Sequence, residues 1–283
     1  MASFTNFATL SYNGGTTNSN IVTGEILEAL TAVKTAVSAN YSAGDRITYA
    51  LSLVNTGTAA ITDYTVTDDL GGYTVGANTV YPLAYNAGTV RYYINGVLQN
   101  APTVTAGPPL TVTGLTVPAG GSAVLIYETT ATPVAPLATG SSITNTATIT
   151  GGGLTTPITA QATVETANSA DLTISKALSP TTVTENGQIT YTFVISNTGN
   201  TEATATGNVV VTDTFAPILR NIAVTYNGTA WTEGTNYTYN AATGVFTTLA
   251  GQITVPAATF TQNTDGTFTV TPGTATLVIT GTV

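Results

Sequence analysis

Two stretches of this 283-residue sequence decide its fold: KTAVSANYSAGDRITYALSLVNTG (34–57) and KALSPTTVTENGQITYTFVISNTG (176–199). In both, an I-T-Y triplet begins 13 residues after the lysine and an N-T-G turn begins 21 residues after it. Between triplet and turn, apolar residues alternate with others, which is typical of a strand with one buried face. The two stretches therefore predict the same strands in two copies of one domain.

The repeat continues beyond these stretches with a period of about 142 residues, read from Lys34 to Lys176. YTVTDDL (64–70) corresponds to VVVTDTF (209–215), and GGSAVLIYETT (120–130) corresponds to PGTATLVITGT (272–282). Thr and Val favour strands, and Gly, Asn and Pro interrupt the sequence every ten residues or so. The sequence predicts an all-β protein.

The composition excludes several classes of function. There is no Cys and no His, which removes disulfides, zinc, haem, iron–sulfur centres and His-dependent nucleophilic catalysis. A net charge of -9 with five cations argues against nucleic acid, and no 18-residue apolar run predicts a membrane span. The opening MASFTNFATLSYNGG lacks the pattern of a secretory signal. We therefore expect that the chain is not an enzyme and that it binds neither a metal nor a cofactor.

The repeat is cut inside a domain. After its copy of the shared strands, repeat one continues with SSITNTATITGGG (141–153) and PITAQATVETANSADLTIS (157–175), which repeat two lacks. The N-terminus, ASFTNFATLSYNGG, resembles the first of these. The matching positions are Thr5, Asn6, Ala8 and Thr9 with Thr144, Asn145, Ala147 and Thr148, and Phe4 and Leu10 stand opposite Ile143 and Ile149.

This cut predicts three parts. Residues 1–28 are donor strands that complete domain two of a neighbouring subunit, 29–168 form domain one, and 169–283 form domain two, which is incomplete without the donor strands. A head-to-tail contact of this kind builds a filament of identical copies. Three alternatives stay open: residues 1–28 fold locally, with helical spacing in EILEALTAVKTAV (25–37); the chain is a piece of a longer array; or the N-terminus closes back onto domain two.

Three kinds of polar residue stand on predicted apolar faces. Lys34 and Lys176, the only lysines, share a face with apolar residues two positions away along their strands, such as Ala32 and Ile174. The same holds for two aspartates, Asp68 and Asp213, and for two asparagines, Asn145 and Asn6. Because an unpaired buried charge costs several kcal/mol, these groups should meet one another.

Two chemistries fit this set. One is a buried Lys–Asp ion pair with an Asn hydrogen bond. The other is an autocatalytic isopeptide bond, in which a neutral lysine attacks the Asn carbonyl while a protonated aspartate promotes the reaction and ammonia leaves. Lys34, Asp68 and Asn145 would react within domain one, and Lys176 and Asp213 would use Asn6 of the next subunit. Glu128 is a rival carboxyl, although Thr280 replaces it in repeat two.

The lysine strand, the I-T-Y and N-T-G stretch, the V-T-D strand and the N-T-A-T strand resemble a bacterial and archaeal surface repeat, the domain of unknown function numbered eleven. The resemblance covers nearly the whole chain twice and implies two tandem immunoglobulin-like β-sandwiches. The order of Lys34, Asp68 and Asn145 also resembles the D-type isopeptide domains of Gram-positive adhesins and pilins. Repeat two departs from that pattern, because its asparagine must come from elsewhere, and no sortase-type sorting signal is present.

These expectations lead to one functional prediction with one alternative. The chain is predicted to be a structural subunit of an extracellular fibre, pilus or appendage on a cell or spore surface, assembled head-to-tail from copies of itself. The alternative is a monomeric adhesin or a stalk fragment from a surface layer.

Overall fold

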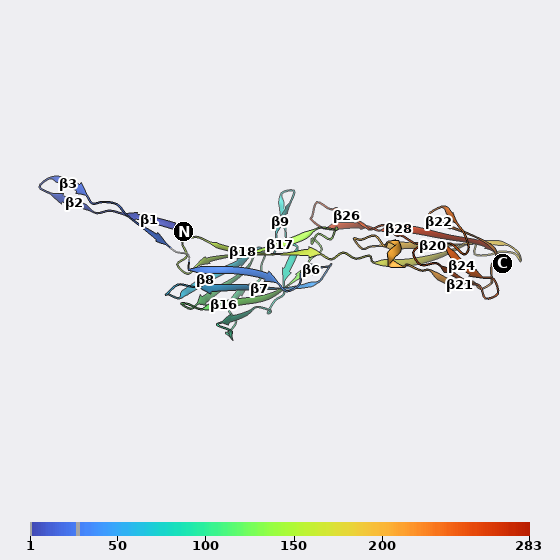
Figure 1. Cartoon of the computed structure of the whole chain (residues 1–283), viewed down its shortest axis with the longest axis horizontal. Coiled ribbons are helices and arrows are strands. Elements are labelled where there is room, and N and C mark those ends of the chain that lie inside the picture. Colours follow the sequence, from blue (N-terminus) through green and yellow to red (C-terminus); the bar gives the residue numbers. More distant parts are fainter. Residues whose placement is uncertain (1, 27–28) are drawn as a thin grey trace.

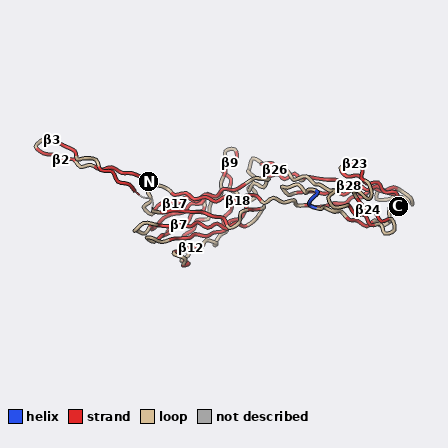
Figure 2. The backbone as a smooth tube through the Cα atoms, viewed as in Figure 1, coloured by secondary structure: helices blue, strands red, loops and turns tan. Residues whose placement is uncertain are grey.

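A computed structural model describes residues 2–26 and 29–283. The described chain is built of strands, with a single 3₁₀ turn, η1 (Ala205–Gly207), which confirms the all-β prediction (Figure 2). The molecule is elongated, with an N-terminal hairpin at one end, two β-sandwiches in line, and the C-terminus at the far end (Figure 1). Within the described ranges, no helix is long and apolar enough to cross a membrane.

Domain one consists of two six-stranded sheets packed face to face. The first sheet has the order β13 (Val97–Leu98), β12 (Arg91–Ile94), β16 (Ser122–Ala131), β7 (Arg46–Asn55) and β5 (Leu30–Ala36), with β11 (Leu83–Tyr85) paired to β16. The second has the order β14 (Thr103–Thr105), β15 (Leu110–Val117), β8 (Ile61–Asp68), β17 (Ser142–Gly151), β18 (Ile158–Thr166) and β6 (Asn40–Tyr41).

The core of domain one follows from the alternation seen in the sequence. Along β7, Ile47, Tyr49, Leu51 and Leu53 are fully buried, while the residues between them face outward. The opposite sheet contributes residues such as Val66 and Ile149 to the same core. Burial of β-branched and aromatic side chains between two pleated sheets stabilises the sandwich.

Domain two repeats the first sheet but only part of the second. Its larger sheet has the order β19 (Leu172–Ser179), β20 (Gln188–Asn197), β28 (Gly273–Thr282), β22 (Arg220–Tyr226) and β23 (Thr229–Trp231). The smaller sheet has three strands in the order β21 (Thr212–Thr214), β25 (Val245–Thr248) and β24 (Tyr237–Asn240). A second core, separate from the first, fills the space between these sheets.

The difference between the two domains lies at β21. In domain one, β8 carries Asp68 and pairs with β15 on one side and with β17 on the other. The equivalent strand β21 carries Asp213 and pairs only with β25 among the described strands. Domain two therefore has no described counterpart of β17 and β18.

The N-terminal segment is a long hairpin that projects away from both sandwiches (Figure 1). Its inner part pairs β1 (Ala2–Asn6) with β4 (Val22–Ile26), and its outer part pairs β2 (Thr9–Tyr12) with β3 (Gly15–Asn18). Asn13 and Gly14 both adopt positive φ at the tip, as a two-residue hairpin turn requires. The helical alternative for residues 25–37 is wrong where it is described, since β4 and β5 are strands; residues 27 and 28 lie outside the described residues.

Two small ribbons meet where the domains join. They are β9 (Tyr73–Val75) with β10 (Asn78–Val80) from domain one, and β26 (Thr259–Gln262) with β27 (Phe268–Thr271) from domain two. Gln262 donates a hydrogen bond to the hydroxyl of Tyr73 at 2.9 Å. A Cβ on Gly266, whose φ is +88°, would lie 2.7 Å from a methyl of Val80, so the close contact requires glycine there.

Candidate functional site

The predicted lysine and aspartate of domain one meet in the core. Lys34, on β5, and Asp68, at the end of β8, face each other across the two sheets, with 2.6 Å between Nζ and Oδ2. Their side chains are 0% and 1% exposed. Asp68 also accepts hydrogen bonds from the hydroxyl of Tyr127 and, at 3.1 Å, from the backbone N–H of Leu70.

Burial determines the electrostatics of this cluster. Loss of water lowers the pKa of the Lys34 amine, although the carboxylate of Asp68 opposes this effect. Burial likewise raises the pKa of the Tyr49 and Tyr127 phenols, and the charge of Asp68 adds to the rise. Relative to an exposed lysine, burial thus makes the neutral form of the Lys34 amine, which is the nucleophilic form, easier to reach.

Asn145 lies beside this cluster without a hydrogen-bond partner. It is on β17, two residues before Ala147, which pairs with Asp68. Successive residues of a strand alternate in direction, so Asn145 and Ala147 point to the same face. Asn145 is 0% exposed, and its amide lies close enough to Tyr49 and Tyr127 to oppose the rise in their pKa, yet neither Nδ2 nor Oδ1 makes a hydrogen bond. A buried amide without partners is costly and calls for an explanation.

The sequence reasoning missed the two tyrosines. Their rings stack with centroids 5.8 Å apart, and the Lys34 Nζ lies 4.9 Å from the Tyr49 centroid and 5.9 Å from that of Tyr127. Both positions belong to alternating patterns in the repeat. Tyr49 is the tyrosine of the I-T-Y triplet, and Tyr127 replaces Ile279 of repeat two, so a position-by-position comparison of the repeats could have singled out both.

Glu128, the rival carboxyl, does not belong to this cluster. It follows Tyr127 on β16 and so points to the opposite face of the sheet. There it lies 3.5 Å from the Arg46 guanidinium, at the surface.

In domain two the equivalent pair is open to solvent. Lys176, on β19, and Asp213, on β21, lie 2.5 Å apart, but their side chains are 40% and 18% exposed. This pair is less buried than the pair of domain one, because the described strands of domain two include no counterpart of β17 and β18 to cover it. The Lys176 Nζ lies 4.4 Å from the centroid of Tyr191 and 5.5 Å from that of Phe215, so the amine faces the core aromatics on its inner side.

An apolar groove runs beside this open pair. It lies between β19 and the segment that leads into β21, and has a volume of about 160 Å³. Its lining includes Ile174, which is 54% exposed, and Val210, which is 46% exposed. Exposed contiguous apolar surface of this kind marks a place where another chain element packs.

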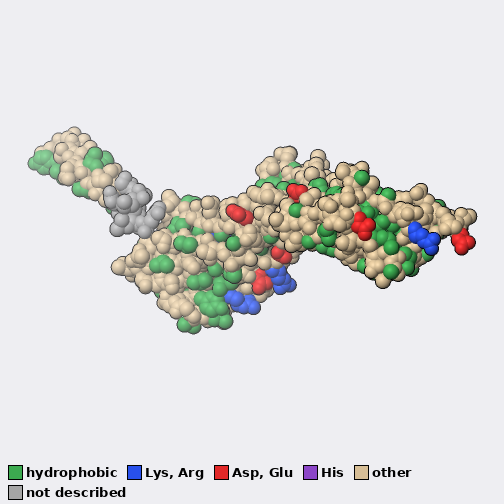
Figure 3. Space-filling model, turned by 45° about the vertical axis from the view of Figure 1, so that its right-hand side comes forward, with side chains coloured by type: hydrophobic (Ala, Val, Ile, Leu, Met, Phe, Trp, Pro, Cys, Tyr) green, Lys and Arg blue, Asp and Glu red, His purple; other side chains and the backbone are tan. Residues whose placement is uncertain are grey.

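Asn6 lies far from this groove within the same chain, at the opposite end of the molecule on β1 (Figure 1). The described hairpin around it is exposed, with Phe4 at 53% and Leu10 at 65%. In the view of Figure 3 the hairpin carries several apolar side chains, and charged side chains are sparse over the molecule. The structure thus brings Lys34, Asp68 and Asn145 together, and pairs Lys176 with Asp213, but leaves Asn6 apart.

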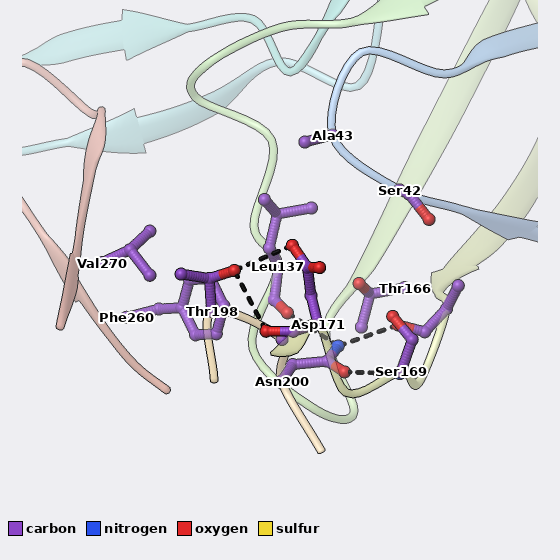
Figure 4. Close-up of a pocket in the computed structure, with 12 residues that line it drawn as sticks. Ser42, Ala43, Leu137, Thr166, Ser169, Asp171, Thr198, Asn200, Phe260 and Val270 are labelled. Atoms are coloured by element: carbon purple, nitrogen blue, oxygen red, sulfur yellow. Dashed lines mark hydrogen bonds between the residues drawn. The ribbon is translucent and has the colours of Figure 1, made fainter. Parts of the chain in front are cut away.

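A second hollow, of about 270 Å³, lies at the junction of the domains (Figure 4). Asn200 holds its walls together: its Nδ2 donates to the carbonyls of Leu137 and Ala167, both at 2.9 Å, and its Oδ1 accepts from the N–H of Ser169. Thr198 donates to Asp171 at 2.8 Å. This network serves the joint between the domains. In the part of the chain that the structure describes, no group of three or more acidic side chains could hold a metal ion.

Comparison with known proteins gives a likeness of fold. No family profile and no curated protein sequence matches the chain. Among solved structures, the chain is similar to BcpA, the major pilin subunit of Bacillus cereus, at 14% identity over 96% of this chain and 73% of that one, with a TM-score of 0.36.

Two further solved structures show how far that likeness extends. The pilus backbone protein RrgB of Streptococcus pneumoniae is 14% identical over 86% of this chain and 55% of that one, with a TM-score of 0.36. A family 123 glycoside hydrolase of Clostridium perfringens is 10% identical over 49% of this chain and 27% of that one, with a TM-score of 0.31. Likenesses at this level indicate no function, which must be argued from the site.

Proposed function

We propose that the chain is a structural subunit of an extracellular fibre, which assembles head-to-tail when the N-terminal hairpin of one copy completes domain two of the next. One observation carries this proposal: β21 and β19 leave an open edge and an apolar groove where domain one has β17 and β18. The segment that resembles β17 and β18 projects from the opposite end of the molecule.

The register of the hairpin supports this use. In domain one, Asn145 pairs with Ala162 and Ser142 with Glu165. In the hairpin, Asn6 pairs with Val22 and Ser3 with Glu25. When Asn6 is matched to Asn145, β4 falls onto β18 with the same serine–glutamate pairing. The inner part of the hairpin, β1 with β4, therefore repeats the register of the strand pair that domain two lacks, whereas β2 and β3 in its outer part pair one residue out of that register.

The same match predicts where the hairpin docks. Because Ala147 pairs with Asp68 and Ile149 with Val66, we expect Ala8 to pair with Asp213 and Leu10 with Val211. Leu10 then lies at the lining of the apolar groove, and Asn6 lies two residues from the pairing position of Asp213. Addition of a strand to a free sheet edge satisfies its backbone groups and buries its apolar face.

We further propose that isopeptide bonds stabilise this fibre. In domain one, the neutral amine of Lys34 attacks the side-chain carbonyl of Asn145, with Asp68 as the promoting carboxyl. The unpartnered amide of Asn145 beside a desolvated Lys34 supports this assignment, because a simple ion pair would leave that amide unsatisfied. Between subunits, Lys176 and Asp213 would act on Asn6 in the same way.

Removal of residues 2–26 tests the assembly. The full chain should form filaments in electron micrographs, and the shortened chain should remain monomeric by light scattering. The matched control substitutes Leu98, an exposed apolar residue on β13, by Ser; this variant should polymerise normally. Filaments from the shortened chain, or a monomeric full chain at high concentration, would contradict the proposal and favour a stalk fragment from a longer array.

Mass spectrometry with peptide mapping tests the isopeptide bonds separately. Domain one should have lost one ammonia, with a branched peptide that joins Lys34 to Asn145. An unmodified mass would contradict the bond but leave the strand exchange standing.

A further inference from the structure

We propose that the crosslink between subunits is gated by docking: Lys176 reacts with Asn6 only after an incoming hairpin has sealed the groove. The covalent bond would then form only at correctly completed joints. This inference rests on the proposed function and adds to it a rule for when the bond forms.

The two lysines differ in how far their side chains are exposed to solvent. The Lys34 side chain is 0% exposed, whereas the Lys176 side chain is 40% exposed. The attack needs a neutral amine, because a protonated amine has no free electron pair with which to attack a carbonyl, and exclusion of water favours the neutral form of an amine. The open groove leaves the Lys176–Asp213 pair in contact with water, whereas the core of domain one excludes water from Lys34 and Asp68.

Lys176 is nevertheless already in position. Its Nζ lies 4.4 Å from the ring centroid of Tyr191, 5.4 Å from that of Phe193 and 5.5 Å from that of Phe215. Contacts of a cation with aromatic faces hold the amine on the core side of β19. Docking therefore needs only to remove water from around the Lys176 amine, and does not need to move it.

The hairpin supplies both the cover and the substrate amide, from β1 and β2. Phe4, Asn6, Ala8 and Leu10 correspond to the alternating inward positions of β17. Phe4 and Leu10, which flank this face, are more than half exposed in the free hairpin. When they pack over the groove, water leaves the Lys176–Asp213 pair at the moment that the Asn6 amide arrives beside it.

The reaction balances without an added reagent. Transfer of the ammonium proton to Asp213 leaves Lys176 as a neutral amine. The Nζ electron pair then attacks Cγ of Asn6, and a C–N bond forms. The Cγ–Nδ2 bond breaks, and the leaving NH₂ group takes up the second proton that Nζ gives up, which makes ammonia. Asp213 then passes the first proton to this ammonia, which departs as ammonium, and Asp213 returns to its carboxylate form.

Two complementary full-length variants test the crosslink. The Asn6→Ala variant keeps the nucleophile, Lys176, and loses the side-chain amide that it attacks. The Lys176→Arg variant keeps the Asn6 amide and a cation at the groove but loses the nucleophile. Each variant alone should form filaments that detergent dissolves into monomers. A mixture should yield a detergent-resistant dimer that contains a Lys176–Asn6 branched peptide. Covalent species larger than the dimer should not form, because each dimer has lost the reactive group at both of its free ends.

The outcomes separate the inference from the proposed function. If the mixture forms filaments but no covalent dimer, the crosslink is wrong and the fibre stands. If the wild-type chain forms no filaments, the proposed function itself is wrong, and the inference fails with it. Adding Asp213→Ala to the Asn6→Ala chain should abolish the dimer while filaments remain; an undiminished dimer would exclude Asp213 from the reaction.

A dilution series of the wild-type chain tests the gate. Ammonia loss in domain one should be complete at every concentration, because folding alone buries Lys34. Ammonia loss at Asn6 should rise with concentration, in parallel with filament formation. A Lys176–Asn6 bond in chains kept monomeric by dilution would overturn the gate.

Discussion

Lys34 and Lys176 occupy equivalent positions in two copies of one domain, each with its aspartate within hydrogen-bonding distance, and yet one pair is sealed and the other is open. The strands that bear them do not cause this difference, because β5 and β19 pair with β7 and β20 in the same antiparallel manner. The cause is the cover. β18 packs against β5, and β17 places Asn145 beside the cluster.

The burial of such a cluster therefore depends on the strands that cover it. Domain one carries its own covering strands and buries its cluster by folding. In the proposed fibre, domain two would receive the same strands from a second molecule, and the two copies would then represent one site before and after closure.

Chemical modification should give the largest difference between the two lysines. In a chain that lacks residues 2–26 and carries Asn145→Ala, neither lysine can form an isopeptide bond, and domain two remains uncovered because the chain does not polymerise. A water-soluble acetylating reagent should modify Lys176 roughly 100-fold or more faster than Lys34, because access to a buried core residue requires opening of the domain. Peptide mass spectrometry over time measures both rates. Similar rates would mean that Lys34 is not sealed.

Removal of each aspartate should have unequal effects on stability. In the Asn145→Ala background, Asp68→Ala leaves a buried amine without its partner and should lower the free energy of unfolding of domain one by about 3–5 kcal/mol. In the chain that lacks residues 2–26, which remains monomeric, Asp213→Ala removes a partly exposed pair and should cost about 0–1 kcal/mol. Urea unfolding, followed by hydrogen exchange in each domain, measures both. Equal losses would contradict the contrast in burial.

Tyr127 makes the surroundings of Asp68 different from those of Asp213. Its hydroxyl donates a hydrogen bond to Asp68, whereas Ile279, at the equivalent position of domain two, has no donor for Asp213. Tyr127→Phe removes the hydroxyl that donates to Asp68 and should cost about 1–2 kcal/mol in domain one. It should also slow the loss of ammonia there and leave the rate at Asn6 unchanged. The domain-two rate is the internal control, and slowing at both sites would indicate a general loss of folding.

Alkaline pH should give the smallest difference in stability between the two domains. Burial raises the pKa of Tyr41 to about 12 and raises the pKa of Tyr49 and Tyr127 as well. These phenols ionise near pH 10 in the unfolded chain and only at higher pH in the folded one, so the stability that their neutral form provides is lost as pH rises above 10. In the Asn145→Ala chain, domain one should lose stability more steeply than domain two, as measured by urea unfolding at increasing pH.

The strands and the paired charges could be predicted from the sequence because both follow from local alternation. Residues such as Ile47 and Leu51 mark the buried face of β7, and the V-T-D strands place Asp68 and Asp213 at matching positions. The two asparagines followed from the likeness between the N-terminus and β17.

What could not be predicted depends on distant parts of the chain. The exposure of Lys176 depends on which strands cover it, and alternation along β19 contains no information about that cover. The contact between Tyr127 and Asp68 joins different sheets. The Asn200 network at the junction of the domains has no signal in the repeat, because Thr58 stands at the equivalent position of repeat one.

The path of the chain through domain one has a mechanical consequence. β5 receives the chain from the hairpin, and β18 passes it on to β19, so a pull along a fibre enters the domain at one of these strands and leaves at the other. A bond between Lys34 and Asn145 would tie β5 to β17, the partner of β18, and the strands between these two residues would carry no tension. Such a fibre would stretch little under load, and each joint would behave as a link in an inextensible thread.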